Sequence, residues 1–230
     1  ALGIAARNKV KDALAGVPKL LEDADLEVRV QALRVLGDNR VTEARPAILA
    51  ALKDESPRVQ SIAAQAISKI PDATALAPLT ALIRKNADAD PWLRHTTIVA
   101  LAACADAKAL RELAVDASPA VRRAVVVAMR RTQNADIVRL LSDADESIVT
   151  EAARAINDAP IEKGVGETAT EALARLLSRT GLNEATQVRA LNANYRLGKA
   201  EHAEAVARFA ARSDAPLKMR LEALRMLDKW

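Results

Sequence analysis

Few residues of this chain have side chains able to do chemistry, and they lie far apart. Cys104 is the only cysteine, and His95 and His202 are separated by 107 positions. A metal site needs three or four closely spaced Cys, His or carboxylate ligands, and an activated nucleophile needs an adjacent base. Gly164 and Gly166 are too few for a phosphate-binding loop and follow no strand-like segment. We therefore expect no catalytic residue, no cofactor, no metal site and no enzyme activity.

One polar pattern does recur along the chain. An Asp or Asn is followed five positions later by an aliphatic residue, which in most copies precedes Arg. The seven copies are Asp23…Val28-Arg29, Asp54…Val59-Gln60, Asp88…Leu93-Arg94, Asp116…Val121-Arg122, Asp143…Ile148-Val149, Asn183…Val188-Arg189 and Asp214…Met219-Arg220. The aliphatic positions are 31, 34, 28, 27, 40 and 31 residues apart. A period of this length is typical of proteins built from stacked structural repeats.

Each copy predicts a helix. In copy one, Val28, Ala32, Leu33 and Leu36 recur at i, i+4, i+5 and i+8, which is the spacing of one helix face. Capping residues followed by proline at 56–57, 90–91 and 118–119 mark helix starts. An earlier helix is expected in most repeats, at 42–53, 72–86, 106–115, 134–141, 167–179 and 199–212. We call these the first helices, and those that follow the Asp or Asn the second helices.

The architecture follows from this pairing. A single helix pair cannot bury its apolar face, whereas stacked pairs can. The expected fold is all-α, a right-handed α-solenoid of about seven helix pairs. The expected single array has an N-terminal helix and repeat 1 at 1–40, repeat 2 at 41–70, repeat 3 at 71–104, repeat 4 at 105–132, repeat 5 at 133–158, an inserted loop at 159–166, repeat 6 at 167–198 and repeat 7 at 199–230. Both ends are expected to be cut from a longer protein, because solenoids usually end in polar caps.

The repeated Arg is expected to point into the contact between repeats, because it lies about 100° round the helix from the aliphatic residue before it. A buried guanidinium needs a partner, and the repeated Asp lies in the adjacent turn. We predict a ladder of Asp and Arg side chains that joins the repeats, broken in copies two and five by Gln60 and Val149. The predicted members are Asp23, Arg29, Asp88, Arg94, Asp116, Arg122, Asp214 and Arg220.

Binding is expected on the exposed face of the second helices, which lines the inner side of such arrays. The candidate binding residues are Arg34, Lys69, His95, Arg123, Arg131, Arg154, Asn194 and Arg225. Of these, His95, Arg123, Arg131 and Arg154 are favoured as the main contacts, and a solvated face without a ligand is the alternative. The loop at 159–166 is either functional or merely tolerated. Trp92 is expected to pack against the turn of repeat 3, with an exposed contact residue as the alternative.

The pattern D-x-x-x-x-[V/L/I/M]-R at the start of each second helix resembles a HEAT repeat, of the shorter kind found in phycobilisome-lyase-like proteins. The stretches 90–95, 152–161, 189–198 and 219–230 also resemble the HEAT segment of large bacterial proteins. Those proteins join a sugar-dehydrogenase-like β-propeller, a HEAT array and a c-type cytochrome module. This second resemblance implies an accessory segment of a multidomain oxidoreductase that is exported to the periplasm. The chain has no C-x-x-C-H motif, and no catalytic residue of those proteins carries over to it.

Three functions stay open. The first is a non-catalytic scaffold that binds a protein partner or neighbouring domains of the same chain. The second is binding to a nucleic-acid backbone, which a net charge of +4 favours; 34 basic residues interleaved with 30 acidic ones and an aromatic content of 2% oppose it. The third is an enzymatic role, as a chromophore lyase or part of the dehydrogenase. No membrane insertion is expected, the oligomeric state is open, and the compartment is cytoplasmic unless the second resemblance holds.

Overall fold

The computed structural model describes residues 14–158 and 165–230, and within these ranges every regular element is helical. The expected N-terminal helix lies, up to residue 13, outside the described residues. So does most of the expected loop at 159–166, although Val165 already begins a helix. The chain forms two compact units, Ala1–Ala109 and Leu110–Trp230.

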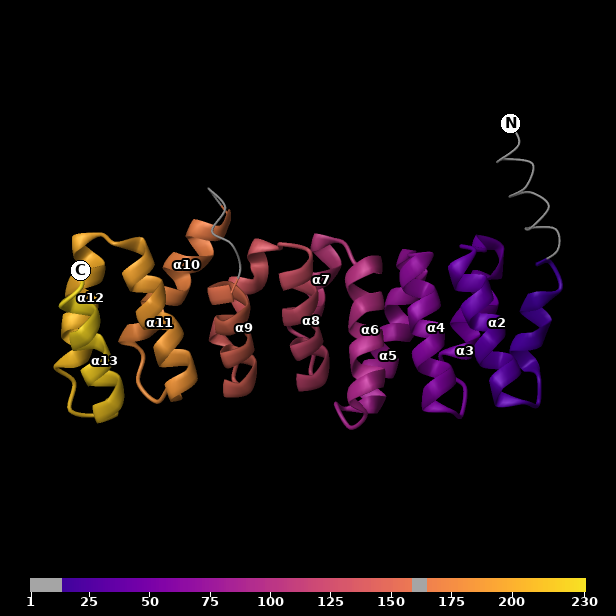
Figure 1. Cartoon of the computed structure of the whole chain (residues 1–230), viewed down its shortest axis with the longest axis horizontal. Coiled ribbons are helices and arrows are strands. Elements are labelled where there is room, and N and C mark those ends of the chain that lie inside the picture. Colours follow the sequence, from indigo (N-terminus) through magenta and orange to yellow (C-terminus); the bar gives the residue numbers. More distant parts are fainter. Residues whose placement is uncertain (1–13, 159–164) are drawn as a thin grey trace, which may run out of the picture. The chain divides into compact units, whose positions relative to one another are not determined.

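The helices of the two units follow one order (Figure 1). The first unit contains η1 (Val17–Glu22), α2 (Leu26–Asp38), η2 (Thr42–Ala44), α3 (Arg45–Ala51), α4 (Pro57–Lys69), η3 (Ala73–Ala75), α5 (Leu76–Asn86) and α6 (Pro91–Cys104), where η denotes a 3-10 helix. Helix α7 (Ala107–Leu113) crosses the division between the units. The second unit continues with α8 (Pro119–Arg131), η4 (Ala135–Ser142), α9 (Glu146–Asp158), α10 (Val165–Arg175), η5 (Leu176–Ser178), α11 (Glu184–Leu197), α12 (Ala200–Ala210) and α13 (Leu217–Leu227).

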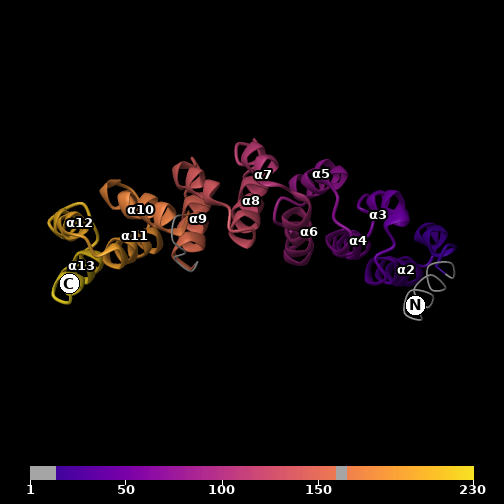
Figure 2. The same cartoon turned by 90° about the horizontal axis from the view of Figure 1, so that it is seen from above.

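Each unit has two layers of helices. In the first unit the second helices α2, α4 and α6 pack side by side, and α3 and α5 form the other layer (Figure 2). In the second unit α8, α9, α11 and α13 pack in succession, with η4, α10 and α12 behind them. This arrangement confirms the predicted all-α fold of the α-solenoid class.

The second helices start where capping chemistry predicts. The side chain of Asp25 accepts hydrogen bonds from the first-turn backbone of α2, and Asp90 does the same for α6. Pro57, Pro91 and Pro119 occupy the first helical position of α4, α6 and α8, where a missing N–H costs nothing. The second helices are therefore fixed locally, before any packing is considered.

Most of the first helices are shorter than predicted, and several contain 3-10 turns. The segment expected as an α-helix at 134–141 is a 3-10 helix, η4. It belongs to the shortest interval between repeats, 27 residues. A 3-10 helix rises about 2.0 Å per residue and an α-helix about 1.5 Å. The same number of residues therefore spans a greater length in a 3-10 helix. The predicted helix is present, at 135–142 instead of 134–141, but its geometry is that of a 3-10 helix.

Copy six also differs from the prediction. Asn183 caps α11 by accepting from the backbone N–H of Thr186, so it corresponds to the capping residue Asp25 and not to the turn residue Asp23. The first buried position of α11 is therefore Thr186, not Val188. The buried stripe continues through Ala190, Leu191 and Asn194, and the register of this copy moves by two residues.

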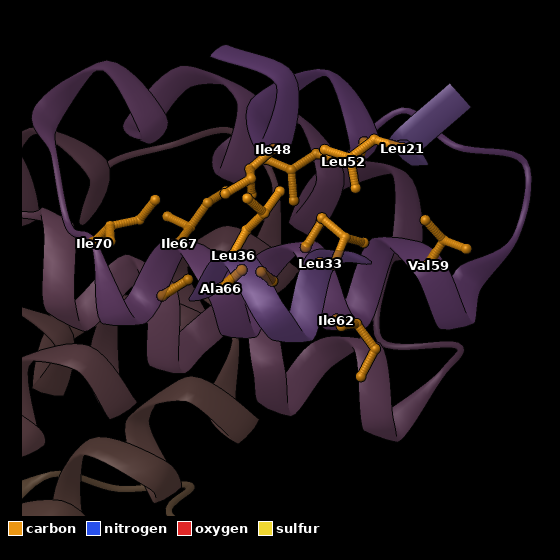
Figure 3. Packing of buried hydrophobic residues seen from close by; sticks show 14 of the residues in the cluster. Leu21, Leu33, Leu36, Ile48, Leu52, Val59, Ile62, Ala66, Ile67 and Ile70 are labelled. Carbon is orange, nitrogen blue, oxygen red and sulfur yellow. The ribbon is translucent and has the colours of Figure 1, made fainter. Parts of the chain in front are cut away.

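The core of the first unit lies between its two layers. Leu33 and Leu36 of α2 meet Ile67 of α4 and Ile48 of α3, and all four are at most 1% exposed (Figure 3). Gly37 allows the close approach of α2 and α4, because a Cβ atom built on it would lie 2.8 Å from the Cα of Ala66.

We predict that Gly37→Ala destabilises the first unit. Helix propensity alone would favour Ala by about 1 kcal/mol, but the clash is with backbone and overpacking costs about 1–3 kcal/mol. The expected net loss is up to about 2 kcal/mol in urea unfolding. Gly16→Ala is the matched control, since nothing lies within 4 Å of the added Cβ. A stabilised Gly37→Ala variant would contradict the packing described.

Candidate functional site

The repeated arginines join successive repeats. In the first unit, Arg29 Nε and Nη2 donate to the carboxylate of Asp54 at 2.9 and 3.3 Å, and Nη1 donates to the backbone oxygen of Asp23 at 2.9 Å. The guanidinium thus holds its own turn and the turn of the next repeat together. Two parallel N–H···O bonds to one carboxylate fix orientation as well as distance.

The second unit repeats this geometry with a more buried pair. Arg122 donates to Asp143 at 2.7 and 3.0 Å and to the backbone oxygen of Asp116 at 2.8 Å. The side chains of Arg122 and Asp143 are 15% and 5% exposed. Burial by itself would raise the pKa of Asp143, but hydrogen bonds from Arg122 and from the Asp145 backbone outweigh it, and the pKa lies below its ordinary value. The hydrogen bond to Asp143 raises the pKa of Arg122.

Two arginine–carboxylate contacts between repeats are present, Arg29 with Asp54 and Arg122 with Asp143, but their residues differ from the predicted pairs. The carboxylate comes from the following repeat, so Asp54 and Asp143 of copies two and five complete rungs, although those copies were expected to break the ladder. Gln60 Nε2 keeps the contact to its own turn, donating to the backbone oxygen of Asp54 at 2.7 Å. Within copy three, Arg94 and Asp88 are 4.0 Å apart.

The last copy shows a further difference. Asp214 pairs with Arg212 at 2.7 Å, whereas Arg220 donates from Nε to the backbone oxygen of Ala210 at 2.8 Å. The preceding repeat offers no arginine to Asp214. Its ladder position in α11 is Gln187, which donates to the backbone oxygen of Leu182. The pairing of Asp214 with Arg220 is therefore wrong, and the reason is the shifted register of copy six.

A second row of ion pairs, between first helices, was not predicted. Arg45 pairs with Asp72 at 3.4 Å and Arg111 with Asp136 at 3.0 Å. In both pairs the acid follows the arginine by 25–27 residues and starts the next first helix. This regular spacing between arginine and acid in the sequence could have predicted the row of ion pairs.

We predict that Arg122→Ala destabilises the second unit by roughly 3 kcal/mol, because it leaves the buried carboxylate of Asp143 without its partner. Urea unfolding measures the loss. Arg131→Ala in the same helix is the control, since Arg131 is exposed and without a partner among the described residues; it should cost less than about 0.5 kcal/mol. Equal midpoints for the two variants would contradict the buried ladder.

The same pair predicts a dependence on pH. The pKa of Asp143 is lowered in the folded state, so its contribution is present above the ordinary carboxyl pKa of about 4 and is lost as pH falls through the folded pKa. The stability difference between wild type and Asp143→Asn should therefore shrink between about pH 6 and about pH 3. A difference that is independent of pH over this range would contradict the assignment.

Most predicted binding residues reach solvent, with one exception. Arg34, Lys69, His95, Arg131, Arg154 and Arg225 are exposed and Arg123 is half-buried. Asn194 is 1% exposed and occupies the apolar stripe of α11, so its placement on the exposed face is wrong. The two-residue shift of copy six accounts for the error.

The predicted binding residues differ in whether their side chains form ion pairs or hydrogen bonds within the chain. Arg123 donates to Ser147 at 2.9 Å, and Arg154 lies 3.7 Å from Asp158. Lys69 pairs with Asp38, and Arg225 lies 3.3 Å from Glu222. Of the predicted binding residues, Arg34 and Arg131 are the cations whose side chains have no ion-pair or hydrogen-bond partner among the described residues, so they are available to a ligand.

A groove on the first unit brings some of these residues together. It has a volume of about 570 Å³ and opens on the second-helix face. We call it the α4 groove; it is lined by Arg34, Ser56, Pro57, Arg58, Ser61, Ile62, Gln65, Asp90 and Trp92. Of the predicted binding residues it contains Arg34, and His95 lies beside it through its ring contact with Trp92, centroids 6.4 Å apart.

The α4 groove combines an aromatic ring with unsatisfied polar groups. Trp92 is 62% exposed, so the expectation that it packs against the turn of repeat 3 is wrong. The hydroxyl of Ser61 is buried and has no hydrogen-bond partner among the described residues. Arg34 supplies a charge without a partner. Arg58 is paired with Glu27 across the repeats at 2.5 Å and forms the rim.

A cavity in the second unit is lined by polar side chains that form hydrogen bonds within the fold. It measures about 470 Å³ and includes Asn194 and His202 in its lining. Asn194 Nδ2 donates to the backbone oxygens of Ala174 and Ala190, and its Oδ1 lies 3.1 Å from His202 Nδ1. The change from α10 to the 3-10 helix η5 frees the Ala174 carbonyl, and Asn194 satisfies it. Buried polar groups need such partners.

Groups for covalent or metal chemistry are not gathered anywhere in the described part of the chain. Burial raises the pKa of the Cys104 thiol, which keeps it protonated and a poor nucleophile at neutral pH. No group of three or more His, Cys, Asp or Glu among the described residues is placed to hold a metal ion. None of the described helices is long and apolar enough to cross a lipid bilayer.

Comparison with known proteins supports the repeat class. Residues 15–90 match the family model described as HEAT repeats. Within residues 15–90 the chain therefore carries HEAT repeats, and the helix pairs of the other described residues follow the same pattern. No curated protein matches it.

Solved structures that resemble the chain have low identity to it. An engineered protein is 21% identical over 97% of this chain and 70% of that chain, with a TM-score of 0.43. The complex of CpcE and CpcF of phycocyanin lyase from Nostoc is 22% identical over 93% and 92%, with a TM-score of 0.44. Human deoxyhypusine hydroxylase in complex with glycerol is 19% identical over 99% and 90%, with a TM-score of 0.42. Values this low carry no argument about function.

Proposed function

We propose that this protein is a non-catalytic scaffold that binds a protein partner through the second-helix face of its first unit. The observation that carries the proposal is the α4 groove, where the exposed ring of Trp92 lies with the unpaired cation Arg34. Trp and Arg are the residues that most often dominate protein interfaces. Here they are contributed by α6 and α2, so a partner would contact several repeats at once.

The chemistry of the groove favours a peptide segment with an acidic and an apolar side chain. An acidic residue would pair with Arg34, and an apolar residue would cover Trp92. The amide of Gln65 is able to bond a peptide backbone or a polar side chain. The exposed residues Lys69, Arg131, Arg154 and Arg225 and the half-buried Arg123 are proposed as secondary contacts outside the groove.

Binding to nucleic acid is supported less well. A nucleic-acid surface needs many cations aligned with the phosphates, whereas Arg58, Lys69, Arg123 and Arg154 all have acidic neighbours. Aromatic residues that would stack on bases are scarce. An accessory role in a larger oxidoreductase is compatible with a scaffold, since the groove would then hold a neighbouring domain.

We predict that peptides selected from a displayed random library for binding to this protein engage the α4 groove. Trp92→Ala should weaken such a peptide by about 30-fold, the effect of losing about 2 kcal/mol at an interface hot spot. Arg34→Glu should weaken it by about tenfold and reduce its preference for acidic residues. Titration calorimetry measures both effects.

The control is Lys85→Glu, a charge reversal in the first-helix layer of the same unit, at an exposed residue outside the groove. It should leave the affinity unchanged. Retention of full affinity by both groove variants would refute the proposed site. Tight binding of duplex DNA with a steep salt dependence, near −0.9 per phosphate contacted, would favour the nucleic-acid alternative.

A further inference from the structure

The turn before helix α6 departs from a pattern that four other copies of the repeat share. In those copies the carboxylate of the repeated Asp accepts a hydrogen bond from the backbone N–H two residues later, at 2.8 Å each time; the acceptors are Asp23, Asp54, Asp116 and Asp143. In copy three the N–H of Asp90 instead donates to the side chain of Asn86, at 3.0 Å. The amide nitrogen of Asn86 donates in return to the backbone oxygen of Asp90, also at 3.0 Å. Asn86 thus holds Asp90 at both polar groups of its backbone.

The backbone of this turn differs as well. Asp88 has a φ of 63°, whereas Asp23 and Asp143, the repeated acids of copies one and five, have φ values of −64° and −61°. Ala87, the residue before Asp88, has a φ of 45°. Left-handed backbone is unfavourable for residues with a Cβ atom, and such residues persist only where the surrounding contacts hold them. The amide of Asn86 closes the turn around these two residues.

The same turn sets the start of α6 and the place of the Trp92 ring. Asp90 caps this helix, and its carboxylate accepts from the N–H groups of Trp92 and Leu93 at 2.8 and 3.0 Å. Trp92 is 62% exposed and lines the α4 groove together with Asp90. At the position of Trp92 the copies with the common turn carry no aromatic residue; they carry Glu27, Arg58, Ala120 and Ser147. The unusual turn and the exposed ring therefore occur in the same copy.

We propose that Asn86 is a positioning residue of the α4 groove. Its amide excludes the common turn, in which Asp88 would accept from the N–H of Asp90, and holds the start of α6 in the form that presents Trp92 to a bound peptide. Such preorganisation raises affinity, because the ligand does not have to select a minor conformation. This role rests on the proposed peptide-binding function, whereas the hold of Asn86 on the turn is measurable without a ligand.

The first experiment measures affinity. The probe is a peptide selected from the displayed library with the wild-type chain, and Trp92→Ala is the reference for a lost groove contact. Asn86→Ala should weaken the peptide about tenfold, as expected when the binding-competent turn falls to about one tenth of the population. Asn39→Ala is the matched control in the same unit, because it also removes a bond from an Asn amide to the backbone, at 2.8 Å, and lies outside the groove. It should bind the peptide as wild type does.

A second substitution separates positioning from stability. Glycine at position 87 removes the cost that a Cβ atom adds to left-handed backbone. The double variant Asn86→Ala with Ala87→Gly should therefore recover the urea midpoint that Asn86→Ala loses. Its peptide affinity should stay low, because glycine permits this turn without holding Asp90 in place. Recovery of both the midpoint and the affinity would overturn the positioning role.

A third readout needs no peptide. In Trp230→Phe, Trp92 is the only tryptophan, and its time-resolved fluorescence anisotropy reports how well the ring is ordered. Asn86→Ala should add a fast depolarisation, and Asn39→Ala should not. An unchanged decay in Asn86→Ala would overturn the inference. So would full affinity of Asn86→Ala for a peptide that Trp92→Ala weakens, and the proposed function would then stand. A peptide that Trp92→Ala does not weaken would refute the proposed function and this role with it.

Discussion

Within each unit, successive second helices cover apolar faces of one another, and the polar turns decide how closely they fit. Hydrophobic burial is not directional, so it does not by itself select one register for two stacked helix pairs. The bidentate contact of Arg122 with Asp143 does, because it ties a guanidinium in one turn to a carboxylate in the next. The same arginine also holds its own turn through the backbone oxygen of Asp116. One side chain thus fixes both the turn before its own helix and the turn of the next repeat.

The polar contact between successive turns changes with the residue that occupies the ladder position. Where Gln60 replaces arginine, the contact to the turn of its own repeat survives but no charge reaches the next repeat. Between repeats five and six the ladder position is Val149, and other groups connect the two helices. Asn183 donates from its backbone to Glu146 at 2.6 Å and from its side chain to Thr150 at 2.7 Å.

Much of the fold was predictable because its signals are local. Helical spacing and capping residues such as Asp25 and Asp90 act within one helix, and the second helices begin where those signals place them. The ladder partners were less predictable, because an arginine and the carboxylate it bonds are 21–25 residues apart in sequence. Asn183 resembled a turn residue in type, and only its hydrogen bond to the α11 backbone shows that it is a cap. The exposure of Trp92 depends on packing around α6, which composition does not record.

The candidate sites depend on departures from the repeat. The α4 groove exists because Trp92 projects from the start of α6 instead of packing inward. In a repeat protein such exceptions are informative, since the equivalent positions of the same chain provide the comparison.

The most direct test of this account is a double-mutant cycle on Arg122 and Asp143. The unfolding free energies of Arg122→Ala, Asp143→Ala and the double variant are compared with wild type in urea. If the pair sets the contact between repeats, the coupling energy should reach about 2 kcal/mol, within the range of directly contacting residues. Effects that add to within about 0.5 kcal/mol, as those of distant sites do, would contradict it and leave hydrophobic packing as the sole determinant of repeat stacking.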